Sequence, residues 1–336
     1  MTLTSSSTKT TALTTMPASV SLQDIETAQQ RIAPAIYRTP LVQLDAGLYA
    51  KAENLQRTNA FKLRGAYNFL AQLDEDARTR GVVAYSSGNH AQGVACAAHL
   101  LNIPATIVIP NNAPEVKVAA TERWGATVIR CGNDHSIRER LAKEVVEREG
   151  RTLVHAFDHP WIVAGQGTAG LEILDDLPDV ANVLVCTGGG GLLAGVAVAI
   201  KERNPKVKVF GVEPELAADA AESFAKGERT VWESSQVSRT IADGVRTIAL
   251  GELNFTLAQR YVDGIITVSE DAIEEATYTY AARHRMVVEP TGALTLAALP
   301  EATAQGHLQE GSTVLMVSGG NVDLTWLANL LAHHTH

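Results

Sequence analysis

The sequence predicts an α/β protein built on two parallel β-sheets, and three features of its 336 residues support this fold class. Short apolar runs alternate with helical patterns, and glycine-bearing turns close most of these runs. Hydrophobic residues make up 46% of the chain and charged residues 19%, which is enough apolar material for one large or two medium domains. A wholly disordered chain is therefore excluded.

The first segment, MTLTSSSTKTTALTTMPAS, is rich in Ser and Thr, and we expect residues 1–20 to be a disordered extension. It has no basic start followed by a long apolar core, as a secretion signal would. No later apolar run is long enough to cross a membrane.

Two series of strand-like runs follow. The first series pairs strands with helices as GVVAYSS with AQGVACAAHLL, ATIVIP with EVKVAATERWG, and ATVIRC with IRERLAKEVVEREG. The second contains NVLVCT with LLAGVAVAIKER, then VKVFGVE, then GIITV with EDAIEEATYTYAARH, and finally STVLMVS. Alternation of this kind is typical of βα units on parallel sheets, so we expect one sheet from each series.

Charge and cysteine usage narrow the classes of partner. The chain carries 37 acidic and 28 basic side chains, a formal charge of -9, and no Lys/Arg stretch interleaved with aromatics, which argues against nucleic acid. Cys96, Cys131 and Cys186 are scattered and lack C-x-x-C spacing, so they indicate neither a disulfide framework nor a zinc site. We therefore expect a cytoplasmic protein.

A run of four glycines, in VLVCTGGGGLLAG, connects a buried strand to the start of a helix. Backbone N–H groups in such a loop can converge on an anion, helped by the helix dipole, so a phosphate is the expected ligand. Gly189, Gly191 and Ala194 also satisfy a dinucleotide pattern with Glu213 as the ribose-binding acid, which leaves an NAD enzyme open. A nucleotide triphosphatase is weaker because Leu192 stands where its lysine is needed, and a tight turn without ligand is the plainest alternative.

Lys62 raises the question of covalent chemistry, because it lies between Phe61 and Leu63 in TNAFKLRGAYNF. If these apolar neighbours anchor the segment, desolvation favours the neutral amine, which attacks aldehydes. A phosphate-bearing aldehyde would use both this lysine and the glycine loop. Polar clusters at two other strand ends, in YSSGNHAQG and VSGGN, mark further candidate site residues.

Four motifs, FKLRGA, SSGNHAQG, GGGGLLAG and SGGN, together resemble the fold-type II pyridoxal phosphate enzymes of the threonine/serine dehydratase and serine racemase group. They occur in the family's order, and the resemblance covers nearly everything after the N-terminal segment. It implies a tryptophan synthase β-like architecture of two parallel-sheet domains. The large domain would comprise residues 21–76 and 159–336, and the small domain residues 77–158.

The resemblance also implies a role for individual residues in binding pyridoxal 5'-phosphate. Lys62 would form the internal aldimine, Phe61 would lie beside the ring, and Asn89 would meet the phenolic oxygen. Ser318 would hydrogen-bond the pyridine nitrogen, which favours elimination over transamination because a neutral hydroxyl leaves the ring a weaker electron sink. The phosphate would be wrapped by the backbone of Gly188, Gly189, Gly190, Gly191 and Leu192.

Other residues are candidates for contacts with the substrate. Ser86, Asn89 and His90 could donate to its carboxylate, although simple N-capping would explain small polar residues there equally. Ser87 resembles the serine of racemases and hydroxyaspartate dehydratases and could exchange a proton with Cα. Arg138 matches a carboxylate-binding arginine of serine racemases, or is an ordinary surface residue of a charged helix.

Oxygen ligands in GVEPELAAD match the family's divalent-cation site, which would bind Mg²⁺ or Ca²⁺ through Glu213, the Ala217 carbonyl and Asp219. The alternative is that these acids lie on a solvated loop and bind no metal.

The remaining histidines fit no zinc motif, and we expect loop, core or tail positions for His155, His159, His333, His334 and His336. One departure from the family is that Asn59 and Ala60 replace the usual Gly-Ser, which puts the preferred β-substituent in doubt.

We therefore expect a dehydratase that converts a 3-hydroxy amino acid such as L-threonine or L-serine to a 2-oxo acid and ammonia, with Lys62 as the general base. The alternatives are a serine racemase or a 3-hydroxyaspartate or phenylserine dehydratase, an NAD-dependent oxidoreductase, and a non-catalytic amino-acid sensor. The chain is too short for an added regulatory domain after the second sheet. By analogy we expect a homodimer.

Overall fold

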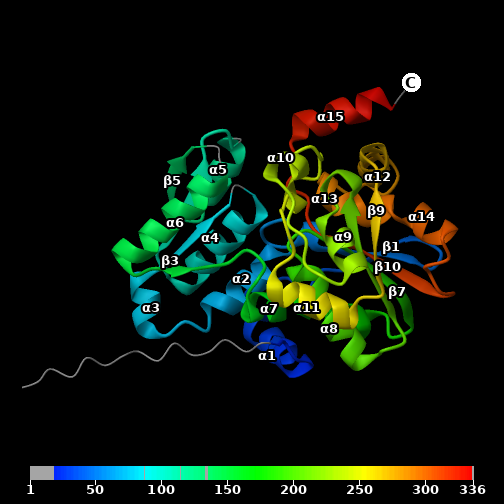
Figure 1. Cartoon of the computed structure of the whole chain (residues 1–336), viewed down its shortest axis with the longest axis horizontal. Helices are drawn as coiled ribbons and strands as arrows, with labels where there is room; N and C mark the ends of the chain where they lie inside the picture. The colour runs from blue at the N-terminus through cyan, green and yellow to red at the C-terminus, as the bar shows by residue number, and fades with distance from the viewer. Residues whose placement is uncertain (1–18, 87, 114, 133–134, 335–336) are drawn as a thin grey trace, which may run out of the picture.

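The computed structural model describes residues 19–86, 88–113, 115–132 and 135–334, which form two lobes side by side (Figure 1). The large lobe contains a six-stranded sheet whose strands, in spatial order, are β1 (Leu41–Asp45), β2 (Leu48–Ala52), β10 (Ser312–Val317), β7 (Val180–Cys186), β8 (Lys208–Pro214) and β9 (Gly264–Val268). The small lobe contains a four-stranded sheet in the order β5 (Thr127–Cys131), β4 (Ala105–Pro110), β3 (Val82–Tyr85) and β6 (Thr152–Leu153). Every strand predicted from an apolar run is present, so the α/β fold class is confirmed.

Helices cover both sheets. They are α1 (Leu22–Ile32), α2 (Lys62–Leu70), α3 (Glu75–Arg80), α4 (Asn89–Leu101), α5 (Glu115–Glu122), α6 (His135–Glu149), α7 (Pro160–Asp176), α8 (Gly191–Arg203), α9 (Asp219–Lys226), α10 (Ser234–Val237), α11 (Glu252–Tyr261), α12 (Glu270–Ala282), α13 (Pro290–Ala297), α14 (Leu299–Ala304) and α15 (Leu324–His333). Three short 3-10 turns are η1 (Glu53–Leu55), η2 (Glu215–Ala217) and η3 (Asp243–Val245). Among the described helices, none is long and apolar enough to cross a bilayer.

The described chain starts beside the large lobe. Ser21 caps α1 and forms a capping box with Asp24, while Ile25 and Ile32 are fully buried on the inner face of the helix. Residues 1–18 of the predicted extension lie outside the described residues. The expected boundary at residue 20 was wrong, because Val20 is 1% exposed and belongs to a small apolar core with α1 and α7.

The first two strands differ from the rest, because β1 and β2 are antiparallel while all other neighbours are parallel. Ala46 and Gly47 alone connect them, and Gly47 has a positive φ of 71°. A two-residue loop can join only antiparallel strands, so this hairpin adds an antiparallel edge to a sheet that the sequence predicted to be parallel.

Helix α2 lies between the lobes and therefore determines where its first residue, Lys62, is held. Its apolar residues Leu63 and Phe69 belong to the core of the small lobe. On its other side α2 packs closely on α7, since a Cβ added at Gly165 would lie 2.6 Å from the Arg64 carbonyl oxygen. Lys62 thus starts a helix in contact with both lobes.

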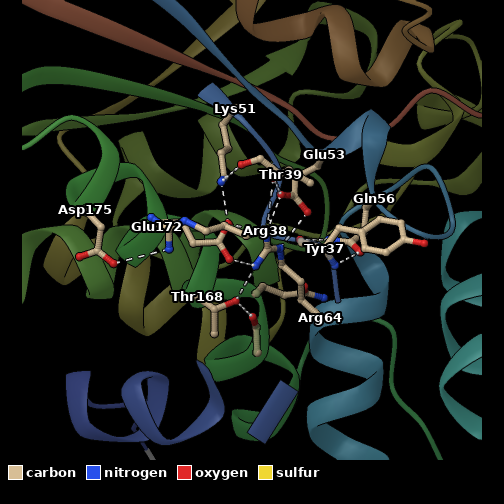
Figure 2. A network of polar contacts seen from close by, with 12 residues as sticks. Tyr37, Arg38, Thr39, Lys51, Glu53, Gln56, Arg64, Thr168, Glu172 and Asp175 are labelled. Carbon is tan, nitrogen blue, oxygen red and sulfur yellow. Dashed lines mark hydrogen bonds and ion pairs between the residues drawn. The ribbon is translucent and has the colours of Figure 1, made fainter. Parts of the chain in front are cut away.

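A buried ionic network fixes the same helix to the large lobe (Figure 2). The Arg64 guanidinium donates to both carboxylate oxygens of Glu53 and of Glu172, each at 2.8 Å. Lys51 donates to Glu172 at 2.6 Å and to the carbonyl of Thr39 at the same distance. All four charged side chains are at most 4% exposed, so two cations balance two anions out of contact with water.

Candidate active site

Two of the sequence motifs are brought together by the backbone. The N–H of Phe61 donates to the Ser318 carbonyl at 3.1 Å, the N–H of Gly320 donates to the Asn59 carbonyl at 2.9 Å, and Ala60 and Gly319 form an antiparallel bridge. FKLRGA and SGGN therefore lie side by side although they are far apart in the chain. Asn59 has a φ of 55°, a left-handed conformation that favours the glycine usual in the family and that asparagine tolerates.

Lys62 lies at the N-terminus of α2 with its amine facing the site. Its Nζ donates to the carbonyl of Ala156 at 3.0 Å and lies 5.0 Å from the centre of the Phe61 ring. Its backbone packs against α4, since a Cβ added at Gly93 would lie 3.1 Å from the Lys62 Cβ. Desolvation lowers the pKa of Lys62 to about 8, so roughly a tenth of this amine is uncharged at pH 7, far more than at the ordinary lysine pKa.

The glycine run forms the predicted loop between β7 and α8. Gly190 is the N-cap of α8 with a φ of 86°, a conformation that L side chains rarely adopt. Gly189 packs on Phe157, whose ring would lie 2.3 Å from an added Cβ. Beside the loop, the Thr247 hydroxyl is buried without a partner among the described residues and lies 3.3 Å from a Cβ added at Gly188. Loop and hydroxyl together leave donors for an anion.

Asn89 is held from two directions. Its Nδ2 donates to the Glu289 carboxylate at 2.6 Å, and its Oδ1 accepts from Asn321 Nδ2 at 2.8 Å. These bonds assign the orientation of the amide and leave the second N–H of Asn89 for a ligand. Burial, and then the charge of Asp243, raise the pKa of Glu289 to about 7.

Ser318 follows β10 and is 1% exposed. Its hydroxyl lies beside the weakly polar thiol of Cys186 and has no oxygen or nitrogen partner among the described residues. Buried hydroxyls are nearly always hydrogen-bonded, so Ser318 is ready to contact a bound group. Desolvation raises the pKa of Cys186 to about 11, and this thiol therefore stays neutral.

The predicted substrate contacts have different environments. Ser86 accepts from the N–H of Gly88 at 3.3 Å, and no polar side chain described in this turn caps α4. His90 is 4% exposed, and its Nε2 donates to the carbonyl of Val154 at 3.0 Å, while desolvation lowers its pKa to about 3. Arg138, on α6, has Tyr85 and Cys131 as electrostatic neighbours at the ends of β3 and β5. Ser87 lies outside the described residues.

The predicted metal ligands lie together at the end of β8. Glu213 is fully buried and accepts from the N–H groups of Ala220 and Ala221 at 3.2 and 2.8 Å, while Ala217 ends η2. Asp219 is also fully buried, and neither of its carboxylate oxygens has a partner in the described part of the chain. Desolvation raises the pKa of Asp219 to about 7, and desolvation followed by the charge of Asp219 raises that of Glu213. Two buried acids, of which Asp219 has both carboxylate oxygens unpaired, fit a hard divalent cation, although no cluster of three His, Cys, Asp or Glu occurs among the described residues.

The sequence did not identify the segment 155–158, which connects the two lobes and packs against the glycine loop through Phe157. It supplies the Ala156 carbonyl to Lys62 and the Phe157 ring to Gly189. His155 was expected to be a loop or core residue; its Nδ1 accepts from the Asp158 N–H at 2.8 Å, and Lys62 is among its electrostatic neighbours. Glu289 was also missed, and the only signal for it is a single acid directly before Pro290.

These groups fit pyridoxal phosphate. The loop offers backbone donors to a phosphate, Lys62 offers an amine with a lowered pKa, and the unpartnered hydroxyl of Ser318 and second N–H of Asn89 remain for a ring. Glu213, which an NAD enzyme would use for ribose, is instead bonded to two backbone amides and adjoins Asp219.

Comparison with known proteins agrees with this assignment. A model of the pyridoxal-phosphate dependent enzyme family matches residues 32–320. The chain is 42% identical over 316 residues to the serine racemase of Schizosaccharomyces pombe, covering 92% of this chain and 96% of that protein. It is 41% identical over 318 residues to the catabolic L-threonine dehydratase of Escherichia coli strain K12, covering 93% and 96%.

A solved structure shows the same architecture. The serine racemase of maize superposes with a TM-score of 0.87 at 39% identity, covering 95% of this chain and 100% of that one. The resemblance based on four motifs is confirmed. The cofactor of this family is pyridoxal phosphate, so the alternative of an NAD-dependent enzyme was wrong. The chain belongs to the pyridoxal-phosphate dependent enzymes.

Proposed function

We propose that this protein is a dehydratase that converts a 3-hydroxy amino acid to a 2-oxo acid and ammonia, with serine or threonine as the first substrates to test. The observation that carries the proposal is the Lys62 amine, whose pKa is lowered to about 8 and which lies between the Phe61 ring and the Ala156 carbonyl. The relatives named above include both a threonine dehydratase and a serine racemase.

The cofactor, when bound, supplies an electron-withdrawing ring that makes the Cα proton of an attached amino acid acidic. Lys62 would accept that proton at Nζ, because a base with a pKa near the working pH transfers protons in both directions most effectively. Ser318 would present a neutral hydroxyl to the ring nitrogen, which would leave that nitrogen without a full charge and favour loss of the β-hydroxyl. Loop 188–192 would hold the phosphate.

The test is ammonia release from the stereoisomers of serine, threonine, 3-hydroxyaspartate and phenylserine. Lys62→Ala should abolish both turnover and the visible absorbance of the bound cofactor. Lys226→Ala, which changes an exposed lysine of α9, is the matched control and should leave both unchanged. Ammonia release and visible absorbance retained by Lys62→Ala would contradict the proposal.

Racemisation is the second candidate activity, favoured by the 42% identity to the serine racemase of Schizosaccharomyces pombe. Ser87 would then exchange a proton with Cα on the side opposite Lys62. Following the optical activity of serine together with ammonia release separates the two activities. Ser87→Ala should abolish racemisation while elimination persists.

The substrate's β-substituent would face a site that lacks the hydroxyl usual at position 60. Ala60 is fully buried, whereas the adjacent Asn59 is exposed, with its Nδ2 3.4 Å from Asn321 Oδ1. This favours a substrate larger or more polar than threonine, which the same panel would identify by the ratio of kcat/KM values.

We also propose that Glu213, the Ala217 carbonyl and Asp219 bind Mg²⁺ or Ca²⁺. The unpartnered Asp219 carboxylate supports this proposal.

For assembly we propose a cytoplasmic homodimer. Leu55 and Val287 are 53% and 48% exposed on adjoining segments, linked by a hydrogen bond from Asn54 to the Val287 carbonyl, and offer apolar surface for a second copy. Light scattering of the purified protein at several concentrations tests the dimer.

A further inference from the structure

Asn254, in the first turn of α11, connects two parts of the site. It is fully buried, and its Nδ2 donates to the Gly189 carbonyl at 2.7 Å and to the Phe157 carbonyl at 3.1 Å. The N–H of Gly251 donates to the same Gly189 carbonyl at 3.1 Å. The glycine loop is therefore attached to the start of α11 through the Gly189 carbonyl oxygen, which accepts two hydrogen bonds.

These bonds determine the orientation of a peptide group. In a trans peptide the C=O and the following N–H point to opposite sides, so holding the Gly189 oxygen toward α11 directs the Gly190 N–H away from it. A peptide between two glycines is otherwise free to rotate, because neither residue has a Cβ to restrict it. Gly190 also packs on Asn254, since a Cβ added at Gly190 would lie 3.0 Å from the Asn254 Cβ.

The second bond of Asn254 reaches the segment that holds Lys62. Phe157 follows Ala156, whose carbonyl accepts from Lys62 Nζ at 3.0 Å. The next residue, Asp158, accepts from the N–H groups of Glu252 and Leu253 at 3.0 and 3.2 Å and so caps α11. One side-chain amide thus links the loop to the segment beside the reactive lysine.

We propose that Asn254 is a positioning residue for the phosphate of the cofactor, which it serves by turning the Gly190 N–H toward that phosphate. The inference rests on the proposed assignment of loop 188–192 to the phosphate. It assigns no contact between Asn254 and the cofactor. Asn254 acts through the Gly189–Gly190 peptide, and loss of its two donated bonds lets this peptide rotate.

The test compares two ligands of the apoenzyme, pyridoxal 5'-phosphate and pyridoxal, which lacks the phosphate. Asn254→Asp keeps the shape of the side chain but cannot donate when ionised, and Asn254→Ser can reach at most one of the two carbonyls. Both variants should raise the Kd of pyridoxal phosphate about tenfold, as expected for loss of one or two hydrogen bonds, and leave the Kd of pyridoxal within about twofold. Equal weakening of both ligands, or of neither, would overturn the proposal.

Gly190→Ala separates this inference from the loop assignment, because it strains the loop itself. If Gly190→Ala does not reduce the preference for the phosphorylated ligand, the assignment of the loop is wrong. If it does while both Asn254 variants keep the preference, only the role of Asn254 is wrong.

A measurement on the wild-type protein follows the Gly190 N–H directly, and it needs a folded variant only for the assignment of the signal. With the 26 glycines labelled with nitrogen-15, the Gly190 amide, assigned by its absence in Gly190→Ala, should move downfield on binding pyridoxal phosphate but not pyridoxal. A Gly190 amide that responds alike to both ligands would show that its N–H does not meet the phosphate, which would overturn the loop assignment and the proposal that rests on it.

Discussion

Asn89 and Glu289 join the two lobes through a 2.6 Å hydrogen bond from the Asn89 side-chain amide to the buried Glu289 carboxylate. Asn89 starts α4 of the small lobe, and Glu289 is the N-cap residue of α13 in the large lobe. The bond places a titratable group directly behind a residue that we expect to contact the cofactor.

Glu289→Gln tests this relationship through the pH dependence of stability. Because burial raises the pKa of Glu289 to about 7, the native protein holds a proton that the unfolded chain releases at the ordinary pKa of 4.5, so stability falls as pH rises between these values. The change is on the order of 3 kcal/mol and should disappear in Glu289→Gln. Urea denaturation between pH 4.5 and 8 measures it, with the exposed Glu147→Gln as control. The same pH slope in Glu289→Gln and wild type would contradict this.

Arg64→Met should destabilise the protein by about 3–5 kcal/mol, because it leaves the carboxylates of Glu53 and Glu172 buried with only Lys51 to balance them. Arg64→Met combined with Glu53→Gln restores neutrality and should recover part of the loss. Denaturation midpoints of the two variants provide the comparison. A double variant no more stable than the single one would show that charge balance is not the cause.

Gly189→Ala should weaken the site by overpacking, since its Cβ would lie 2.3 Å from the Phe157 ring. We expect a loss of stability of about 1–3 kcal/mol and a higher Kd for pyridoxal phosphate. Adding Phe157→Ala removes the obstructing ring and should relieve the overpacking. The two variants are compared by thermal unfolding and cofactor titration; absence of any relief would mean that the ring is not the obstacle.

The ion pair of Lys117 and Asp243 links α5 of the small lobe with η3 of the large lobe at 2.7 Å. The Asp243 side chain is 42% exposed, so we expect at most about a fivefold rise in KM, with kcat little changed, for Lys117→Ala. Added salt should raise the KM of the wild type toward that of the variant. Lys143→Ala, which breaks an exposed pair within α6, is the control and should leave KM unchanged.

Divalent cations should raise the unfolding temperature more at pH 8 than at pH 6. Both Asp219, with its pKa raised to about 7, and Glu213 must lose protons before they can bind a cation, so affinity increases with pH. Asp219→Asn should abolish the effect of Mg²⁺ and Ca²⁺. An equal temperature shift in Asp219→Asn would place the cation elsewhere.

Local patterns in the sequence were sufficient for most strands of the two sheets, but not for β1, β2 and β6. The run VANVLVC in β7 is buried along its whole length. An apolar run of this kind followed by glycines predicts a buried strand from neighbouring residues alone. The roles of Lys62, the glycine loop, Asn89 and Ser318 were predicted from the resemblance of four motifs to one family, and they stay predictions.

Only the tertiary structure decided which distant residues pair with one another. The bonds of Asn89 to Glu289, of Lys62 to the Ala156 carbonyl, and of Asn254 to Gly189 join positions far apart in the chain. A side chain's neighbours along the chain determine its helix or strand, but its hydrogen-bond partners and its pKa depend on which surfaces the two lobes bring together. The sequence by itself therefore determined the elements and the chemical groups, and the packing of the lobes decided which of those groups meet.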